Sequence, residues 1–183
     1  MASWKNKRKI IQRYDLTAQM YDERYAEEQR AKHKASLENL KVAGCTILDV
    51  GCGTGLFFNQ VTAQASLVVG IDISRKLLLK AKERADVLGN VSVLQADADH
   101  LPFKEAFFDI VFAFTVLQNI PKPIETLNEM KRGIVMGGKI VATGLKKALP
   151  LPNFMDVLEG SGLVVVSFVD REDLKCYIAI LTT

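Results

Sequence analysis

Residues 46–56, with the sequence TILDVGCGTGL, decide the fold that this chain is predicted to adopt. The residues up to Val50 form the short apolar run expected of a buried parallel strand, and a turn follows at once. Three glycines fall within residues 51–55, where missing side chains allow backbone angles closed to other residues and let a ligand approach the main chain. A helix is predicted over residues 56–63, so its N-terminus would point at a ligand on the turn.

The spacing of these glycines separates two classes of ligand. The dinucleotide fingerprint needs a glycine at its sixth position, where this sequence has Leu56. Asp49 lies two residues before the first glycine and is a poor neighbour for a pyrophosphate. S-adenosylmethionine carries a sulfonium, an ammonium and no phosphate. The turn therefore favours S-adenosylmethionine, and a nicotinamide oxidoreductase is the disfavoured alternative.

A second apolar run supports a nucleoside ligand. Residues 67–71 are apolar and end in Asp72, which lies 21 positions after Gly51. At this distance a carboxylate at a strand end meets ribose hydroxyls in nucleoside-binding folds.

Four motifs in order resemble the class I S-adenosylmethionine-dependent methyltransferases, in particular the small type 11 group. The resemblance covers roughly residues 14–145. It implies an α/β fold with a Rossmann-like, doubly wound, seven-stranded sheet in the order 3-2-1-4-5-7-6, in which strand 7 is antiparallel. The motifs are residues 49–55 (DVGCGTG), residues 70–74 (GIDIS), Asp97 with Leu101-Pro102-Phe103, and Phe108-Asp109.

The resemblance also implies S-adenosylmethionine as the cofactor. Asp97 would accept a hydrogen bond from the adenine amino group, and the backbone N–H of Ala98 would donate to the ring. No metal site is expected. The predicted cofactor-binding residues are Asp49, Gly51, Cys52, Gly53, Gly55, Asp72, Ile73, Asp97, Ala98 and Thr115.

Three residues are the candidates for orienting the methyl acceptor. Residues 115–121, TVLQNIP, follow a predicted strand and lie at the edge where doubly wound sheets bind ligands. Many relatives have two histidines where this sequence has Gln118 and Asn119. Methyl transfer is an in-line displacement in which positioning supplies much of the rate, so an acid–base residue is not required. Gln118 and Asn119, with Tyr21 from the N-terminal segment, are therefore the predicted catalytic residues.

A single domain spanning residues 1–183 is predicted, with three sections. Residues 1–13 carry five Lys and Arg residues, and are interpreted as a solvated, partly disordered tail or as a basic arm that contacts phosphates. Residues 14–42 are a helical region whose first half resembles a lid over the cofactor, although its tyrosines would equally staple it to the core. Lys32 and His33 are expected on the exposed side of this region. Residues 43–183 form the core.

Composition bounds the remaining possibilities. The net charge of +3 does not by itself establish a nucleic-acid partner. The three cysteines include no C-x-x-C pair, which argues against a disulfide framework or zinc cluster and favours a reducing cytoplasm. No run approaches the roughly eighteen apolar residues of a membrane span, so no membrane partner is expected.

The methyl acceptor is predicted to be a tRNA or rRNA. Lys146 and Lys147 follow a predicted strand at the cofactor edge, and Arg171 lies on a neighbouring loop. The N-terminal arm adds Lys5, Lys7, Arg8 and Lys9, so that these cations would form a phosphate-binding rim. The sequence also resembles RNA methyltransferases that use a small zinc-ribbon activator subunit, to which residues 163–168 would offer an edge strand. A small-molecule acceptor is a close alternative, and a protein acceptor ranks third. A non-enzymatic alternative is a regulatory subunit that binds the cofactor without transferring its methyl group.

Overall fold

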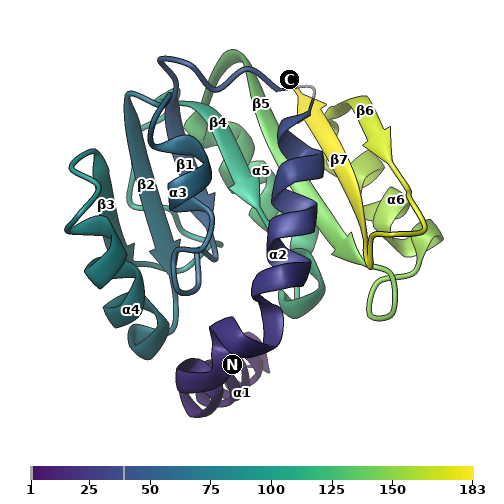
Figure 1. Cartoon of the computed structure of the whole chain (residues 1–183). Coiled ribbons are helices and arrows are strands. Elements are labelled where there is room, and N and C mark those ends of the chain that lie inside the picture. The colour runs from purple at the N-terminus through teal and green to yellow at the C-terminus, as the bar shows by residue number, and fades with distance from the viewer. Residues whose placement is uncertain (1, 39) are drawn as a thin grey trace.

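The computed structural model describes residues 2–38 and 40–183, which form a seven-stranded sheet between two layers of helices (Figure 1). The strands are β1 (Thr46–Val50), β2 (Leu67–Asp72), β3 (Val91–Gln95), β4 (Phe108–Ala113), β5 (Ile134–Leu145), β6 (Val164–Val169) and β7 (Cys176–Thr182). The helices are α1 (Ala2–Thr17), α2 (Tyr21–Leu37), α3 (Phe58–Val61), α4 (Arg75–Ala85), α5 (Pro123–Gly133) and α6 (Leu151–Gly160), with short 3₁₀-helices η1 (Ala18–Met20) and η2 (Leu117–Asn119).

The strand order confirms the predicted topology. It runs β3-β2-β1-β4-β5-β7-β6, and β7 is antiparallel to both of its neighbours, whereas β1 to β5 are mutually parallel. In the register of β1 and β2, Asp49 pairs with Gly70. The carboxyl ends of β1, β2, β4 and β5 therefore share one edge of the sheet, and the loops that follow them meet there.

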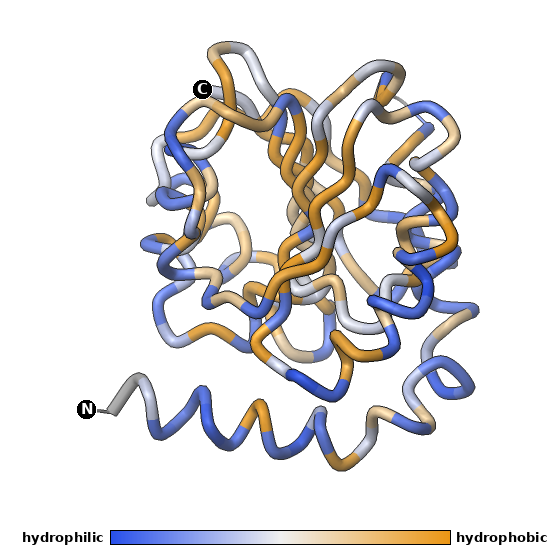
Figure 2. The backbone as a smooth tube through the Cα atoms, turned by 90° about the vertical axis from the view of Figure 1, so that its left-hand side faces the viewer, coloured by the Kyte–Doolittle hydropathy of each residue, from blue (hydrophilic) through white to orange (hydrophobic). Residues whose placement is uncertain are grey.

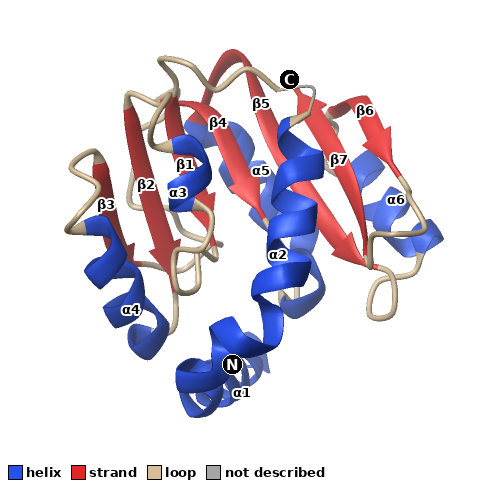
Figure 3. Ribbon diagram, in the orientation of Figure 1, coloured by secondary structure: helices blue, strands red, loops and turns tan. Residues whose placement is uncertain are grey.

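The central strands are buried on both faces, which explains why they read as continuous apolar runs. Helices α2, α3 and α4 cover one face of the sheet, and α5 and α6 cover the other (Figure 3). Along β1, Ile47 belongs to the core under the first group of helices, and Leu48 and Val50 belong to the core under the second. All three are fully buried, so β1 holds both layers of the core together.

The turn after β1 needs its glycines for two reasons. Gly51 has φ +72°, and a Cβ atom there would lie 2.6 Å from Cγ2 of Val116. Gly55 has φ +79°, and its Cβ would lie 2.5 Å from the ring of Phe58. Both positions thus combine a left-handed backbone with a lack of space. The helix that follows, α3, is shorter than the predicted span of residues 56–63 because turns occupy both of its ends.

The N-terminal residues form a helix, so the expectation of a partly disordered tail over residues 1–13 is wrong for the part described. Helix α1 lies across the carboxyl edge of the sheet, and its tube is largely hydrophilic (Figure 2). It is attached by polar contacts, since Oγ of Ser74 donates to Asp15 at 2.5 Å and Nζ of Lys7 lies 2.7 Å from both carboxylate oxygens of Asp97. Such long-range ion pairs leave no periodic signal in a sequence.

Ser74 provides a test of how the helix that follows β2 begins. It is the N-cap of α4, and its Oγ accepts from the backbone N–H of Leu77. Replacing Ser74 by Ala removes this cap and the contact with Asp15, so we expect the free energy of unfolding to fall by about 1–2 kcal/mol. Chemical denaturation measures this. Ser92→Ala, at an exposed position of β3, is the matched control and should change stability by less than about 0.5 kcal/mol. An equal loss in both variants would contradict the capping role.

Candidate functional site

A cavity of about 840 Å³ lies at the carboxyl edge of the sheet, where side chains from α1 and α2 also line it. Most of the residues singled out from the sequence lie on its walls. A second cavity of about 20 Å³ shares Tyr21 and Gly51 with the first and is lined by Asp49 and Cys52. Gly55 lies outside both cavities and provides space for Phe58. The predicted residues that line the larger cavity are Tyr21, Gly51, Gly53, Asp72, Ile73, Asp97, Ala98, Thr115, Gln118 and Asn119.

Asp72 is held rigidly at the end of β2. Its Oδ2 accepts from the backbone N–H of Gly53 at 3.0 Å, and its Oδ1 accepts from that of Ser74 at 2.8 Å. Burial raises the pKa of Asp72, while these hydrogen bonds oppose the rise. Each carboxylate oxygen still has a free acceptor site. Asp72 can therefore receive two ligand hydroxyl groups.

Asp49 is a buried carboxyl group with no donor among the described residues. Its exposed fraction is 2%, and burial, reinforced by the charge of Asp72, raises its pKa to about 8. Since no hydrogen bond in the described part of the chain supports the charged form, a cationic ligand group would compensate it. This environment fits an ammonium or sulfonium group.

The third carboxylate of the nucleoside end, Asp97, is paired with Lys7. Nζ of Lys7 lies 2.7 Å from Asp97 and 2.5 Å from Asp99, and the side chain of Lys7 is 9% exposed. Although burial opposes it, hydrogen bonding to the two carboxylates raises the pKa of Lys7. Lys7 was expected in a solvated tail or against phosphates; instead it closes this end of the cavity.

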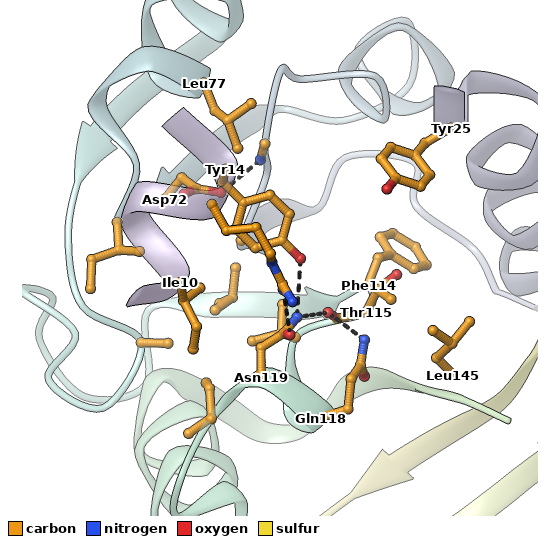
Figure 4. A pocket seen from close by; sticks show the side chains of 18 of the residues that line it. Ile10, Tyr14, Tyr25, Asp72, Leu77, Phe114, Thr115, Gln118, Asn119 and Leu145 are labelled. Carbon is orange, nitrogen blue, oxygen red and sulfur yellow. Dashed lines mark hydrogen bonds between the residues drawn. The ribbon is translucent and has the colours of Figure 1, made fainter. Parts of the chain in front are cut away.

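Thr115 has a strained backbone that four side chains hold in place. Its φ of +61° is unusual for a β-branched residue. Its N–H donates to Oγ1 of Thr143 at 2.8 Å, and its Oγ1 accepts from Nζ of the buried Lys32 at 2.8 Å. Its carbonyl accepts from Nε2 of Gln118 and Nδ2 of Asn119 (Figure 4). Strain supported in this way is typical of functional sites.

The two neighbouring amides differ in what they leave free. Oδ1 of Asn119 accepts from Arg13, and its Nδ2 is within 3.2 Å of the hydroxyl of Tyr14 (Figure 4). Asn119 thus ties α1 to the turn after β4. Gln118, in contrast, has a buried Oε1 that receives no hydrogen bond from the described residues. The oxygen of Gln118 is therefore the one of the two amide oxygens that lacks a partner among the described residues.

The far end of the cavity has aromatic and apolar walls and one carboxylate that sequence reasoning missed. Tyr25, Phe114 and Leu145 are the walls (Figure 4). Glu28 follows Tyr21 and Tyr25 on α2 at a spacing of four and then three residues, which places all three on one helix face. The spacing is visible in the sequence, but it predicts that Glu28 lines the site only once Tyr21 is known to face the site.

The prediction that Lys32 and His33 are exposed is wrong. Lys32 is 1% exposed and His33 is 3% exposed. His33 packs against Phe57 and Phe114, and Nδ1 of its ring lies 2.9 Å from Nε2 of Gln60. Burial, together with the charge of Lys32, lowers the pKa of His33 to about 3. His33 is therefore a neutral core residue.

Three cations of the predicted basic rim, Lys7, Lys146 and Arg171, pair with carboxylates within the chain. Nζ of Lys146 lies 2.6 Å from Asp170, and the guanidinium of Arg171 pairs with Glu38 and Asp173. Lys147 lines the mouth of the cavity and is exposed. Within the described residues, no helix is long and apolar enough to cross a bilayer.

Comparison with known sequences identifies relatives of the core. A family model described as "Methyltransferase domain" matches residues 48–142. A demethylmenaquinone methyltransferase of Oceanobacillus iheyensis is 34% identical over 114 residues, 59% of this chain and 48% of that protein. A malonyl-[acyl-carrier protein] O-methyltransferase of Marinomonas sp. is 30% identical over 144 residues, 77% of this chain and 53% of that protein. The chain spans about half the length of these curated relatives.

Solved structures share the fold. A SAM-dependent methyltransferase from Aquifex aeolicus superposes with a TM-score of 0.76 at 20% identity, covering 91% of this chain and 97% of that one. The methyltransferase solved in complex with the Haloferax volcanii Trm112 activator has a TM-score of 0.76 at 18% identity, covering 92% and 96%. At these identities the likeness establishes the fold.

The neutral His33 predicts how stability depends on pH. Its pKa of about 3 in the folded chain lies below the value of about 6.5 in the unfolded chain, so only the unfolded chain takes up the proton as the pH falls. The stability contributed above pH 6.5 is therefore lost on acidification, by about 2 kcal/mol between pH 6.5 and 4.5. Urea denaturation of the protein and of His33→Gln measures the difference. A His33 ring that titrates near pH 6.5 by NMR in the folded state would contradict this.

Proposed function

Because the chain belongs to the class I S-adenosylmethionine-dependent methyltransferase family, we propose that it transfers a methyl group from that cofactor to a small-molecule acceptor. The observation that carries the proposal is the continuous cavity of about 840 Å³ at the carboxyl edge of the sheet. Its nucleoside end is lined by Asp72 and Asp97, and its other end by Tyr25, Phe114 and Leu145. Donor and acceptor would thus share one cavity.

The residues at the nucleoside end fit S-adenosylmethionine. Asp72 would bind the ribose hydroxyls, and Asp97 with Ala98 and Ile73 would hold the adenine. The unpartnered carboxyl of Asp49 would receive the ammonium group and regain its charge. When bound, the cofactor supplies a methyl group on a positively charged sulfur.

The chain's own residues would position the acceptor and exclude water. Tyr14, Tyr21 and Tyr25 line the cavity from α1 and α2 and form tilted aromatic pairs in sequence. Burial raises the pKa of Tyr21, so its hydroxyl stays neutral. Gln118 offers its free Oε1 to the acceptor, whereas Asn119 acts by holding Thr115 and α1. Positioning of this kind supplies much of the rate of an in-line displacement.

A small molecule is favoured over the RNA that the lysines first indicated. Lys7, Lys146 and Arg171 already have carboxylate partners, which removes three of the seven cations of the predicted rim. The relatives described above are named for demethylmenaquinone and malonyl-[acyl-carrier protein]. Label in the RNA or protein fraction of the extract experiment would instead indicate an RNA or protein acceptor. The zinc-ribbon activator also stays a prediction, because the likeness to the Trm112 partner extends to the fold alone.

Cofactor binding through Asp49 should release a proton. With a pKa of about 8, the carboxyl is mostly protonated at pH 7, and an ammonium ligand favours the carboxylate. Calorimetric titration with S-adenosylhomocysteine in two buffers of different ionisation enthalpy should therefore show close to one proton released. Affinity should rise with pH from about 5.5 to 7.5, by at most about tenfold per unit. Asp49→Asn is the control and should release none. Buffer-independent heats for the wild type would contradict the assignment.

The acceptor class is tested by incubating the protein and methyl-labelled S-adenosylmethionine with a cell extract that is then separated into small molecules, RNA and protein. We expect the label among the small molecules. Asp72→Ala removes a charged hydrogen-bond acceptor, so cofactor affinity should fall about ten- to a hundredfold and labelling at limiting cofactor should be lost. Label in RNA would support the RNA acceptor instead. Cofactor binding without label in any fraction would support a regulatory subunit.

A further inference from the structure

The acceptor end of the cavity contains a carboxylate to which no role has been assigned. Three carboxylates line the cavity within the described chain, and two of them, Asp72 and Asp97, belong to the loops after β2 and β3. The third, Glu28, lies on α2, close to Thr115 after β4 and Lys175 before β7. Glu28 is therefore on the opposite side of β1 from the nucleoside end.

We propose that Glu28 is a catalytic residue that accepts the proton of a hydroxyl or amino group on an aromatic methyl acceptor. This inference rests on the proposed function and adds the chemical class of the acceptor. The geometry that carries it is the fixed position of Glu28, the free Oε1 of Gln118, and the aromatic walls around them.

Two lysines fix Glu28 from either side. Nζ of Lys32 lies 3.5 Å from Oε1, and Nζ of Lys175 lies 3.2 Å from Oε2. Lys32 is itself anchored, because it is buried and donates to Thr115 at 2.8 Å. The side chain of Glu28 nevertheless remains 23% exposed and lines the cavity. Each carboxylate oxygen has two lone pairs, so both can still accept from a ligand.

The second observation is the unsatisfied amide of Gln118. Its Oε1 is buried and receives no hydrogen bond from the described residues, although a buried polar atom is normally paired. Glu28 thus presents acceptor atoms at this end of the cavity, and Gln118, which lines it as well, keeps an unpaired oxygen covered in the cavity wall. A ligand that carries hydrogen-bond donors would satisfy them, whereas an ether, a thioether or an ionised carboxylate would not.

The walls specify the body of that ligand. Tyr25 and Phe114 are aromatic, Leu145 is aliphatic, and all three face the same space (Figure 4). A flat aromatic ring gains most from such walls, because offset and edge-on packing add to the burial of apolar surface. A hydroxylated or amino-substituted aromatic molecule therefore matches both the walls and the acceptor atoms.

Transfer of the acceptor's proton to Glu28 accounts for every atom and charge in the methyl transfer. The acceptor oxygen or nitrogen uses its lone pair to form the new bond to the methyl carbon. The methyl–sulfur bond breaks, and its electron pair stays on sulfur, which becomes a neutral thioether. The proton of the acceptor passes to Glu28, and from there to solvent when the product leaves.

The inference is tested by ligand binding, without turnover. The protein is saturated with S-adenosylhomocysteine and titrated with 2-naphthol or its methyl ether, 2-methoxynaphthalene, followed by the fluorescence of each ligand. The wild type should bind 2-naphthol about tenfold or more tightly than the ether, since a hydrogen bond to a charged group is lost in the ether. Glu28→Gln should reduce this preference to about threefold or less. Glu27→Gln, at a neighbouring exposed position of α2, is the matched control and should keep it.

Several outcomes would overturn the role of Glu28. The first is equal binding of the two ligands, and the second is no binding of either. The third is a preference for 2-naphthol that survives in Glu28→Gln, because such a preference would reflect only the smaller size of 2-naphthol. If Glu28→Gln does not fold, Gln118→Met provides the second variant, and an unchanged preference there would count against the shared acceptor site. Failure to bind S-adenosylhomocysteine at all would instead contradict the proposed function, so the two failures are distinguishable.

Discussion

Parallel pairing of β1 with β2 on one side and with β4 on the other is the constraint on which the site depends. It brings the carboxyl ends of three strands to one edge, and with them the glycine turn, Asp72 and Thr115. Strand β1 is buried on both faces. A slip of its register by one residue would therefore move Asp49 to the opposite face of the sheet and place every core side chain of β1 in the wrong layer. The position of the chemistry is thus fixed by the same packing that stabilises the fold.

Helix α1 completes the site by a different kind of interaction. Contacts from α1 to the core are polar and spread along the helix, from Lys7 at Asp97 through Arg13 at Asn119 to Asp15 at Ser74. Polar contacts near a surface stabilise less than burial of apolar surface does, and salt weakens them. A cover attached in this way can separate from the core at a small cost while the sheet stays intact.

The sequence was most informative where neighbouring residues determine the structure. The glycine turn, the carboxylate of Asp72 and the cap at Ser74 follow from spacings of a few residues, and the strand order follows from the family resemblance. Lys7 could not be placed in the same way, because its partner Asp97 lies 90 positions along the chain. The prediction that His33 is exposed was wrong for a related reason. A polar residue on a charged helix is usually exposed, but His33 is buried against aromatic partners from other parts of the chain.

The two carboxyl groups near the turn, Asp49 and Asp72, have a consequence for the lifetime of the protein. Burial and the charge of Asp72 raise the cost of ionising Asp49, which has no internal cation beside it among the described residues. A ligand that supplies the missing positive charge binds the native chain and not the unfolded one, and therefore stabilises the native state. The abundance of such a protein would follow the supply of its cofactor, because unliganded chains spend more time open to proteolysis.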